Sequence, residues 1–267
     1  MMKISVALAT YNEERNIVAC LESVAGLADE IVVVDGSSHD RTVELAKRFT
    51  DKIIIKDNPP IFHLNKNVAI DSCTGEWILL LDADERFSPQ LTKELVTVAS
   101  SQSQHDGYFI KRKNLFMGQW MKKGGLYPDP VIRFFRRGKG RLPAQSVHEQ
   151  VKVDGSVGWL ENDLLHLADP TFFRYLTRSN RYTTLSAQEL MKQDPGISVL
   201  VILKYLLVLA PMRFLTLYVR HRGFEDGFPG FVWALYSSLH IFTSYVKYWE
   251  AKHGTNSAGR DPLTEWA

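Results

Sequence analysis

The sequence has little of several features that would point to a function directly. Only two of its 267 residues are cysteines. Cys20 and Cys73 lie in segments that are expected to be helical, so we expect two buried, reduced thiols and no disulfide. The N-terminus has no positively charged region followed by an apolar run of signal-peptide length, so we expect it to form the first strand of a cytoplasmic protein.

An excess of one charge and the glycine motifs that bind phosphate are also missing. The 32 basic and 30 acidic residues leave a formal net charge of +2, which argues against nucleic acid as a partner. No Gly-x-Gly-x-x-Gly follows the first apolar segment, and no Gly-x-x-x-x-Gly-Lys occurs in the sequence. The dinucleotide-binding and P-loop routes to phosphate are therefore excluded. If a nucleotide binds, acidic side chains and a metal ion must hold it.

The N-terminal part of the chain alternates between short apolar segments and segments that favour helices. Strands are expected at 3–9, 30–35, 52–56 and 78–81, and helices at 12–25, 40–49, 64–73 and 89–101. Asn12 is predicted to cap the first helix and Ser88 the last. This alternation predicts an α/β fold with a doubly wound, mostly parallel sheet.

Polar and acidic residues follow the predicted strands, at the edge where open α/β sheets bind ligands. They are Thr10, Glu13, Asp35, Asp82 and Asp84. Glu85 extends the last pair to three acids within four positions. Carboxylates this close repel one another, so something positive must share the site, and oxygen ligands suit Mg²⁺ or Mn²⁺. The alternative is a solvated turn without a ligand.

The middle of the chain offers candidates for a second half of the site. Strands are expected at 107–113 and 130–136, and the Gly- and aromatic-rich loop between them is a natural place for acceptor contacts. Five basic residues lie within 133–141, where a solvated hairpin and a phosphate-binding patch are equally good interpretations. Taken alone, Glu149 fits an exposed strand edge and His166 fits a core histidine.

The last third of the chain is apolar and aromatic. After a helix predicted to end near Gln193, the segment 197–209 is interrupted only by Lys204. Pro211 is expected to kink or end that second helix. Residues 227–246 contain no Asp, Glu, Lys or Arg. The pattern fits two helices lying in the headgroup region of a membrane, with ordinary packing faces or membrane-spanning helices as alternatives.

Three ordered motifs connect these segments to a known family. They are ATYNEE at 9–14, VVDGSSHD at 33–40 and LDADE at 81–85. With them, the chain resembles the family-two glycosyltransferases of the GT-A fold. Four later motifs look like the branch of lipopolysaccharide-core and lipooligosaccharide β-1,4-glucosyltransferases: YPD at 127–129, RFFR at 133–136, VHE at 147–149 and GFEDG at 223–227.

The resemblance implies a role for each candidate residue. The donor would be bound by Thr10, Glu13, Asp35, Asp82 and Asp84. Among these, Asp35 would accept a hydrogen bond from the base and Asp82 would contact the ribose. Asp84 would bind Mg²⁺ or Mn²⁺, and His166 would complete the metal or diphosphate site. Glu149 matches best the general base that the acceptor half of the family supplies.

The resemblance also implies a reaction and a domain organisation. An inverting, metal-dependent enzyme would move a hexose, glucose in this branch, from a UDP-sugar to a glycolipid or saccharide acceptor of the lipopolysaccharide core. Residues 1–195 would form the GT-A domain, with the nucleotide-sugar half at 1–105 and the acceptor half at 106–195. A helical extension at 196–253 would associate with the inner face of the cytoplasmic membrane, and 254–267 would be a mobile tail.

Three alternatives stay open on the sequence. A polyprenyl phosphate acceptor would fit the apolar helices equally well. A phosphatase of the haloacid dehalogenase type also uses a strand followed by Asp-x-Asp, but there the motif normally ends the first core strand, whereas here it ends the fourth and precedes Glu85. The third alternative is a membrane-bound scaffold with a degenerate nucleotide fold, although no acidic position of the motifs is missing.

Overall fold

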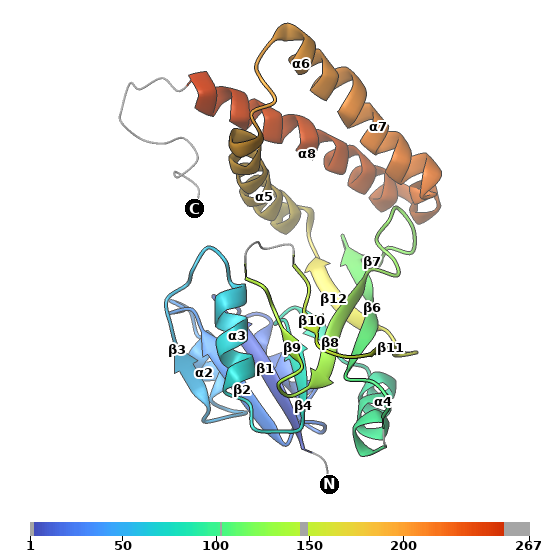
Figure 1. Ribbon diagram of the computed structural model, residues 1–267. Coiled ribbons are helices and arrows are strands. Elements are labelled where there is room, and N and C mark those ends of the chain that lie inside the picture. The colour runs from blue at the N-terminus through green and yellow to red at the C-terminus, as the bar shows by residue number, and fades with distance from the viewer. Residues whose placement is uncertain (1–2, 102, 145–148, 254–267) are drawn as a thin grey trace. The chain divides into compact units, whose positions relative to one another are not determined.

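The computed structural model describes residues 3–101, 103–144 and 149–253. The chain divides into two compact units, which consist of Met1–Lys113 with Pro128–Leu167 and of Asn114–Tyr127 with Ala168–Ala267. Most strands belong to the first unit, and most of the second unit is helical (Figure 1). The predicted tail at 254–267 lies outside the described residues.

The first four strands form the predicted parallel sheet. They are β1 (Ile4–Thr10), β2 (Glu30–Asp35), β3 (Ile53–Ile55) and β4 (Trp77–Leu81), in the spatial order β3-β2-β1-β4. Helices cover both faces of this sheet. α1 (Ile17–Glu22), α2 (Thr42–Ala46) and α4 (Pro89–Ser100) pack on one face, and α3 (His63–Asp71) packs on the other. The fold is therefore doubly wound α/β, as predicted.

Beyond β4 the sheet continues with mostly antiparallel pairings. β8 (Pro130–Arg136) runs antiparallel to β4 and to β6 (Gly107–Phe116), and the order ends with β12 (Leu164–Asp169) and β5 (Glu85–Arg86). The remaining strands are β7 (Gln119–Trp120), β9 (Gly140–Arg141), β10 (Lys152–Val153) and β11 (Val157–Trp159). This mixed part brings β8 directly beside the strand that carries the Asp-x-Asp motif.

Helix α1 begins later than predicted, and Asn12 does not cap it. Asn12 has a left-handed backbone (φ +53°), which the short side chain of Asn tolerates. Its side chain accepts a hydrogen bond from the His39 N–H at 2.9 Å, and its own N–H donates to Ser38 Oγ at 2.8 Å. Asn12 therefore ties the loop after β1 to the loop after β2, both of which lie at the ligand-binding edge.

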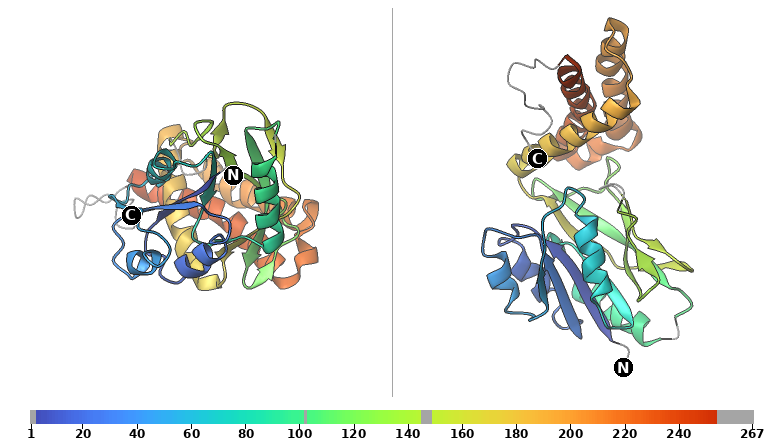
Figure 2. Two further views of the ribbon diagram at one scale, coloured as in Figure 1. Left: turned by 90° about the horizontal axis from the view of Figure 1, so that it is seen from below. Right: turned by 60° about the vertical axis from the view of Figure 1, so that its left-hand side comes forward.

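The second unit contains three long helical segments. α5 (Phe172–Gln193) comes first, and α8 (Gly227–His253) comes last and packs against α5 and α7 (Figures 1 and 2). Between them, one helical segment runs through α6 (Val199–Leu203), η1 (Lys204–Leu209), α7 (Ala210–Leu215) and η2 (Thr216–Arg220), and the short η3 (Gly223–Asp226) leads into α8. The segment does not end at Pro211, which corrects that part of the prediction. The preceding turn is π-helical, and this wider turn accommodates a residue without an N–H.

Asp226, in the GFEDG motif, forms hydrogen bonds with the backbone of the Gly- and aromatic-rich loop, within the second unit. Its buried carboxylate accepts hydrogen bonds from the N–H groups of Lys122 at 3.1 Å and Lys123 at 2.7 Å. The indole N–H of Trp233 donates to the Gly124 carbonyl at 3.1 Å. The GFEDG motif, which resembles one branch of the family, therefore stabilises the conformation of the predicted acceptor loop.

Both cysteines are buried and free, as predicted. Cys20 lies in α1, and Cys73 lies just after α3. Burial raises the pKa of Cys73 to about 12, so this thiol stays protonated at neutral pH and is a poor nucleophile.

Candidate active site

Three strand ends bring predicted donor residues to one edge of the sheet. Thr10 pairs with Asp35 in the register between β1 and β2. In the register between β1 and β4, Leu8 pairs with Leu81, so Asp82 follows at the same edge. Since parallel strands point their carboxyl ends the same way, residues far apart in the sequence meet here.

Asp35 is held firmly by its neighbours. Its side chain is fully buried and accepts hydrogen bonds from Thr10 Oγ1 at 2.9 Å, Ser38 Oγ at 2.7 Å and the Ser38 N–H at 2.7 Å. A carboxylate has about four acceptor positions, so about one is left for a further donor. The nearby Glu13 carboxylate accepts from Asn16 Nδ2 at 2.7 Å. Both acids are thus oriented by the protein itself.

Asp82 lies between two cations of the protein. Lys66 Nζ contacts its Oδ1, and Arg133 Nη2 contacts its Oδ2. Burial alone would raise the pKa of Asp82, but the charges of Arg133 and Lys66 outweigh burial and hold that pKa far below its usual range. Burial lowers the pKa of the Lys66 ammonium, whereas the neighbouring acids raise the pKa of Arg133 despite its burial. Asp82 is therefore ionised at neutral pH.

Asp84 and His166 form the candidate metal pair. Asp84 Oδ1 lies 3.6 Å from His166 Nε2, and the two side chains are 17% and 13% exposed. The Leu167 N–H donates to the Asp84 carbonyl at 2.8 Å, which brings β12 against the Asp-x-Asp loop. Within the described ranges, no group of three or more His, Cys, Asp or Glu is arranged as a metal site. The single carboxylate of Asp84 is compatible with Mg²⁺, because Mg²⁺ often takes one or two carboxylates and completes its shell with water and substrate phosphates.

Glu149 lies outside any helix or strand, next to the start of α3. The predicted strand around it falls partly on residues 145–148, which are outside the described residues. Glu149 Oε2 is 3.9 Å from His63 Nδ1, and the side chains are 19% and 4% exposed. His63 begins α3, and Lys66 follows three residues later, so these two side chains lie near one face of that helix. Helix α3 therefore contributes a contact to Glu149 and another to Asp82.

The sequence reasoning missed Lys66 and His63, and it misread Arg133. It required a positive charge beside the acids but considered only a metal ion. Arg133 lies in a strand among the apolar residues Val131, Ile132, Phe134 and Phe135. A charged side chain in an apolar strand needs a buried partner of opposite charge. The apolar residues on both sides of Arg133 could therefore have predicted that it is buried and ion-paired, unlike its basic neighbours.

Four of the five basic residues at 133–141 contact acids of the same chain. Arg136 lies 4.0 Å from Asp106, Lys139 lies 3.3 Å from Asp154, and Arg141 lies 2.7 Å from Asp71. Only Arg133 points to Asp82. Each of these four cations pairs with an acid of the same chain. For Arg136, Lys139 and Arg141 the ion pairs favour the solvated hairpin.

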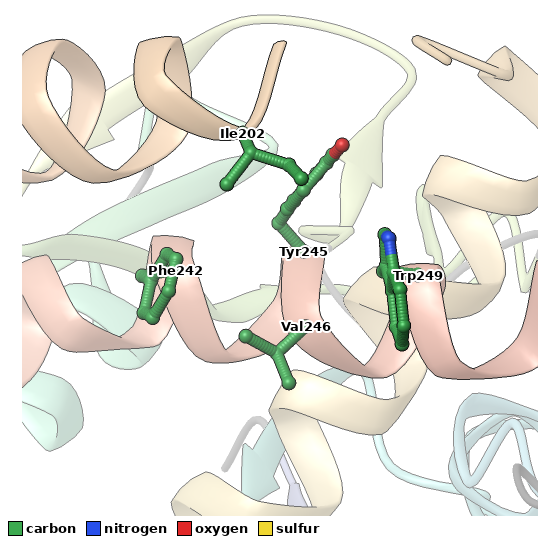
Figure 3. A pocket seen from close by; sticks show the side chains of 5 residues that line it. All are labelled: Ile202, Phe242, Tyr245, Val246 and Trp249. Carbon is green, nitrogen blue, oxygen red and sulfur yellow. The ribbon is translucent and has the colours of Figure 1, made fainter. Parts of the chain in front are cut away.

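A pocket of about 140 Å³ in the second unit is a different kind of cavity. Its lining consists of Ile202 of α6 and, from α8, Phe242, Tyr245, Val246 and Trp249 (Figure 3). All five side chains are aliphatic or aromatic. A nucleotide sugar needs polar and charged partners, so this pocket is not a candidate donor site.

Several known proteins are similar to this chain. The lipopolysaccharide core biosynthesis glycosyltransferase LpsC of Rhizobium meliloti is 27% identical over 255 residues, which cover 93% of both chains. An uncharacterised glycosyltransferase of Rickettsia typhi is 28% identical over 244 residues, which cover 87% of this chain and 82% of the relative.

Among solved structures, a crystal structure of TarS from S. aureus aligns with a TM-score of 0.46 and 18% identity, over 92% of this chain and 50% of that chain. The glucosyl-3-phosphoglycerate synthase of Mycobacterium tuberculosis, solved with Mn²⁺ and UDP-glucose, aligns with a TM-score of 0.36 and 21% identity, over 43% of this chain and 44% of that chain. The aligned part thus spans half or less of each of these solved chains. Residues 5–150 match the model of glycosyl transferase family 2, and the chain belongs to this family.

Proposed function

We propose that the protein is an inverting, metal-dependent hexosyltransferase that moves glucose from a UDP-sugar to a lipopolysaccharide-core or related cell-envelope glycan. The observation that carries the donor side is the meeting of Thr10, Asp35 and Asp82 at one sheet edge. Asp84 follows on the same loop, and His166 of β12 lies beside it. Family membership supports sugar transfer. The acceptor class is supported by the lipopolysaccharide-core relative.

The proposed reaction is a single displacement. The acceptor oxygen forms a bond to the anomeric carbon while the bond from that carbon to the diphosphate oxygen breaks. Glu149 takes the proton of the acceptor hydroxyl as general base. Attack on the face opposite the leaving group inverts the anomeric carbon, by the logic that separates inverting from retaining glycosidases. Asp84 and His166 would hold the divalent ion, which would supply Lewis-acid stabilisation of the charge on the departing diphosphate.

The reaction can be tested with the purified, metal-loaded protein and a panel of nucleotide sugars. We expect mass spectrometry to find a hexose added to a lipopolysaccharide-core glycolipid, with UDP-glucose as the best donor. NMR of the product should show a β-linkage formed from the α-linked donor. Addition to polyprenyl phosphate instead would overturn the acceptor assignment, and an α-linked product would overturn inversion.

We further propose that residues 196–253 hold the protein on the inner face of the cytoplasmic membrane. Among the described helices, Val199–Arg220 is long and apolar enough to cross a membrane, by length and composition alone. Six of its apolar side chains are more than half exposed: Val199, Leu200, Leu207, Met212, Leu215 and Val219. Arg213, Arg220 and Arg222 are exposed as well. Apolar side chains with nearby arginines suit a surface of anionic lipids.

Membrane association can be tested by placing charge on this helix. Leu200 and Leu207 are 79% and 62% exposed, so replacing both by aspartate should not disturb a core. We expect the double variant to lose about tenfold or more of its binding to anionic vesicles in a sedimentation assay, because two apolar side chains no longer enter the lipid. Val96→Asp, at a position of α4 that is 43% exposed, is the matched control and should bind like the wild type. Equal binding by all three proteins would contradict the proposal.

A further inference from the structure

The carboxylate of Asp82 contacts two cationic side chains of the protein. Lys66 comes from α3, Asp82 follows β4, and Arg133 comes from β8. The two cations use different oxygens of Asp82, since Lys66 contacts Oδ1 and Arg133 contacts Oδ2. Two of about four acceptor positions are thus occupied, and about two are left for a ligand.

The exposure of these side chains shows which of them can meet a ligand. The side chain of Asp82 is 25% exposed, whereas those of Lys66 and Arg133 are 7% and 8% exposed. The cations therefore lie behind the carboxylate, and the carboxylate is the more accessible group. Lys66 and Arg133 are placed to act on a ligand through Asp82 and not to bind a diphosphate themselves.

Arg133 is fixed in turn by Glu85. Its Nε and Nη2 lie 3.2 Å and 2.7 Å from Glu85 Oε1, and the Asp82 N–H donates to Glu85 Oε2 at 2.9 Å. Glu85 is fully buried. Lys66, Asp82, Arg133 and Glu85 thus form one network of ion pairs, and Arg112 Nη1 lies 4.0 Å from the same Glu85 oxygen. Removing one member leaves a neighbouring buried ion with fewer partners. Such a network restricts Asp82 to one orientation.

We propose that Lys66 and Arg133 are positioning residues of the donor site, which aim the Asp82 carboxylate at the two hydroxyls of the donor ribose. This inference rests on the proposed UDP-sugar donor. The two acceptor positions left on Asp82 match two neighbouring hydroxyl donors. Lys66 and Arg133 should therefore affect recognition of the nucleoside, although both carry the charge expected of a diphosphate ligand.

Calorimetric binding of uridine and of UDP separates this role from direct diphosphate contact. In Lys66→Met, we expect the affinities for uridine and for UDP to fall by the same factor, about tenfold, because both ligands carry the ribose. Adding Lys66→Met to Asp82→Asn should cause no further loss, since Lys66 acts through Asp82. Lys93→Met, on the exposed face of α4, is the matched control and should bind both ligands like the wild type.

Conservative variants distinguish a loss of positioning from a loss of folding. Lys66→Arg should recover most of the affinity that Lys66→Met loses. Arg133→Lys keeps the charge but not the two hydrogen bonds to Glu85, so it should lower both affinities by the same factor, with circular dichroism showing that the variant is folded. These comparisons carry the test if Lys66→Met does not fold.

The outcomes that overturn the inference are distinct. A loss of UDP affinity with unchanged uridine affinity in Lys66→Met would show direct contact with the diphosphate. Unchanged binding of both ligands would show that Lys66 does not position Asp82, and the proposed donor would still stand. If the wild-type protein bound neither uridine nor UDP, the proposed donor would fall and this inference with it.

Discussion

Replacing Asp84 by alanine should lower sugar transfer by about a thousandfold or more and abolish Mn²⁺ binding. Asp84 and His166, 3.6 Å from each other, are the two side chains that we propose as ligands of the ion. Asp82 is less suited to that task, because both of its oxygens already contact cations of the protein. Loss of the ion leaves the charge of the leaving diphosphate without its Lewis acid, which is worth several kcal/mol. The measurements are steady-state kinetics and, independently of activity, electron paramagnetic resonance of Mn²⁺.

The control for Asp84→Ala is Asp154→Ala. Asp154 is also an ion-paired aspartate, at 3.3 Å from Lys139, but its side chain is 88% exposed. This variant should keep both transfer and Mn²⁺ binding. Full activity of the wild-type protein with all divalent metal chelated would refute the metal role.

Replacing Glu149 by glutamine should remove transfer while donor binding remains. The amide has nearly the shape of the carboxylate but cannot take a proton from the acceptor hydroxyl. General base catalysis contributes about 10² to 10⁴ in rate, so a loss of that size in kcat is expected. Calorimetry with UDP, beside kinetics with the glycolipid acceptor, separates the two effects.

Glu44→Gln provides the matched change at an exposed position of α2 and should leave both quantities unchanged. Loss of donor binding as well as transfer in Glu149→Gln would identify a structural role for Glu149. Glu149 lies 3.9 Å from the buried His63 at the start of α3, so a structural Glu149 would support α3 and through it Lys66. In that case donor binding and transfer would fall together.

Local patterns were enough to predict much of the fold. The β-branched and aliphatic runs ending at Asp35 and Leu81 form buried parallel strands, because their side chains suit a sheet that is covered on both faces. Ser88 caps α4 as predicted, with its Oγ accepting from the Leu91 N–H at 3.1 Å, because capping depends only on neighbouring residues. The start of α1 was misplaced, since the bonds of Asn12 reach across to the loop after β2.

The sequence by itself determined the alternation of strands and helices, the acids at the strand ends and the need for positive charge beside them. These depend on side-chain periodicity and on charges that are close along the chain. Only the tertiary structure decided which cations meet which acids. Arg133 and Asp82 are separated by 51 positions, and they meet because β8 pairs with β4. Lys66 reaches the same carboxylate from α3, on a face of the sheet that no local pattern specifies. Pairings of this kind follow from strand order and helix packing, which are properties of the whole fold.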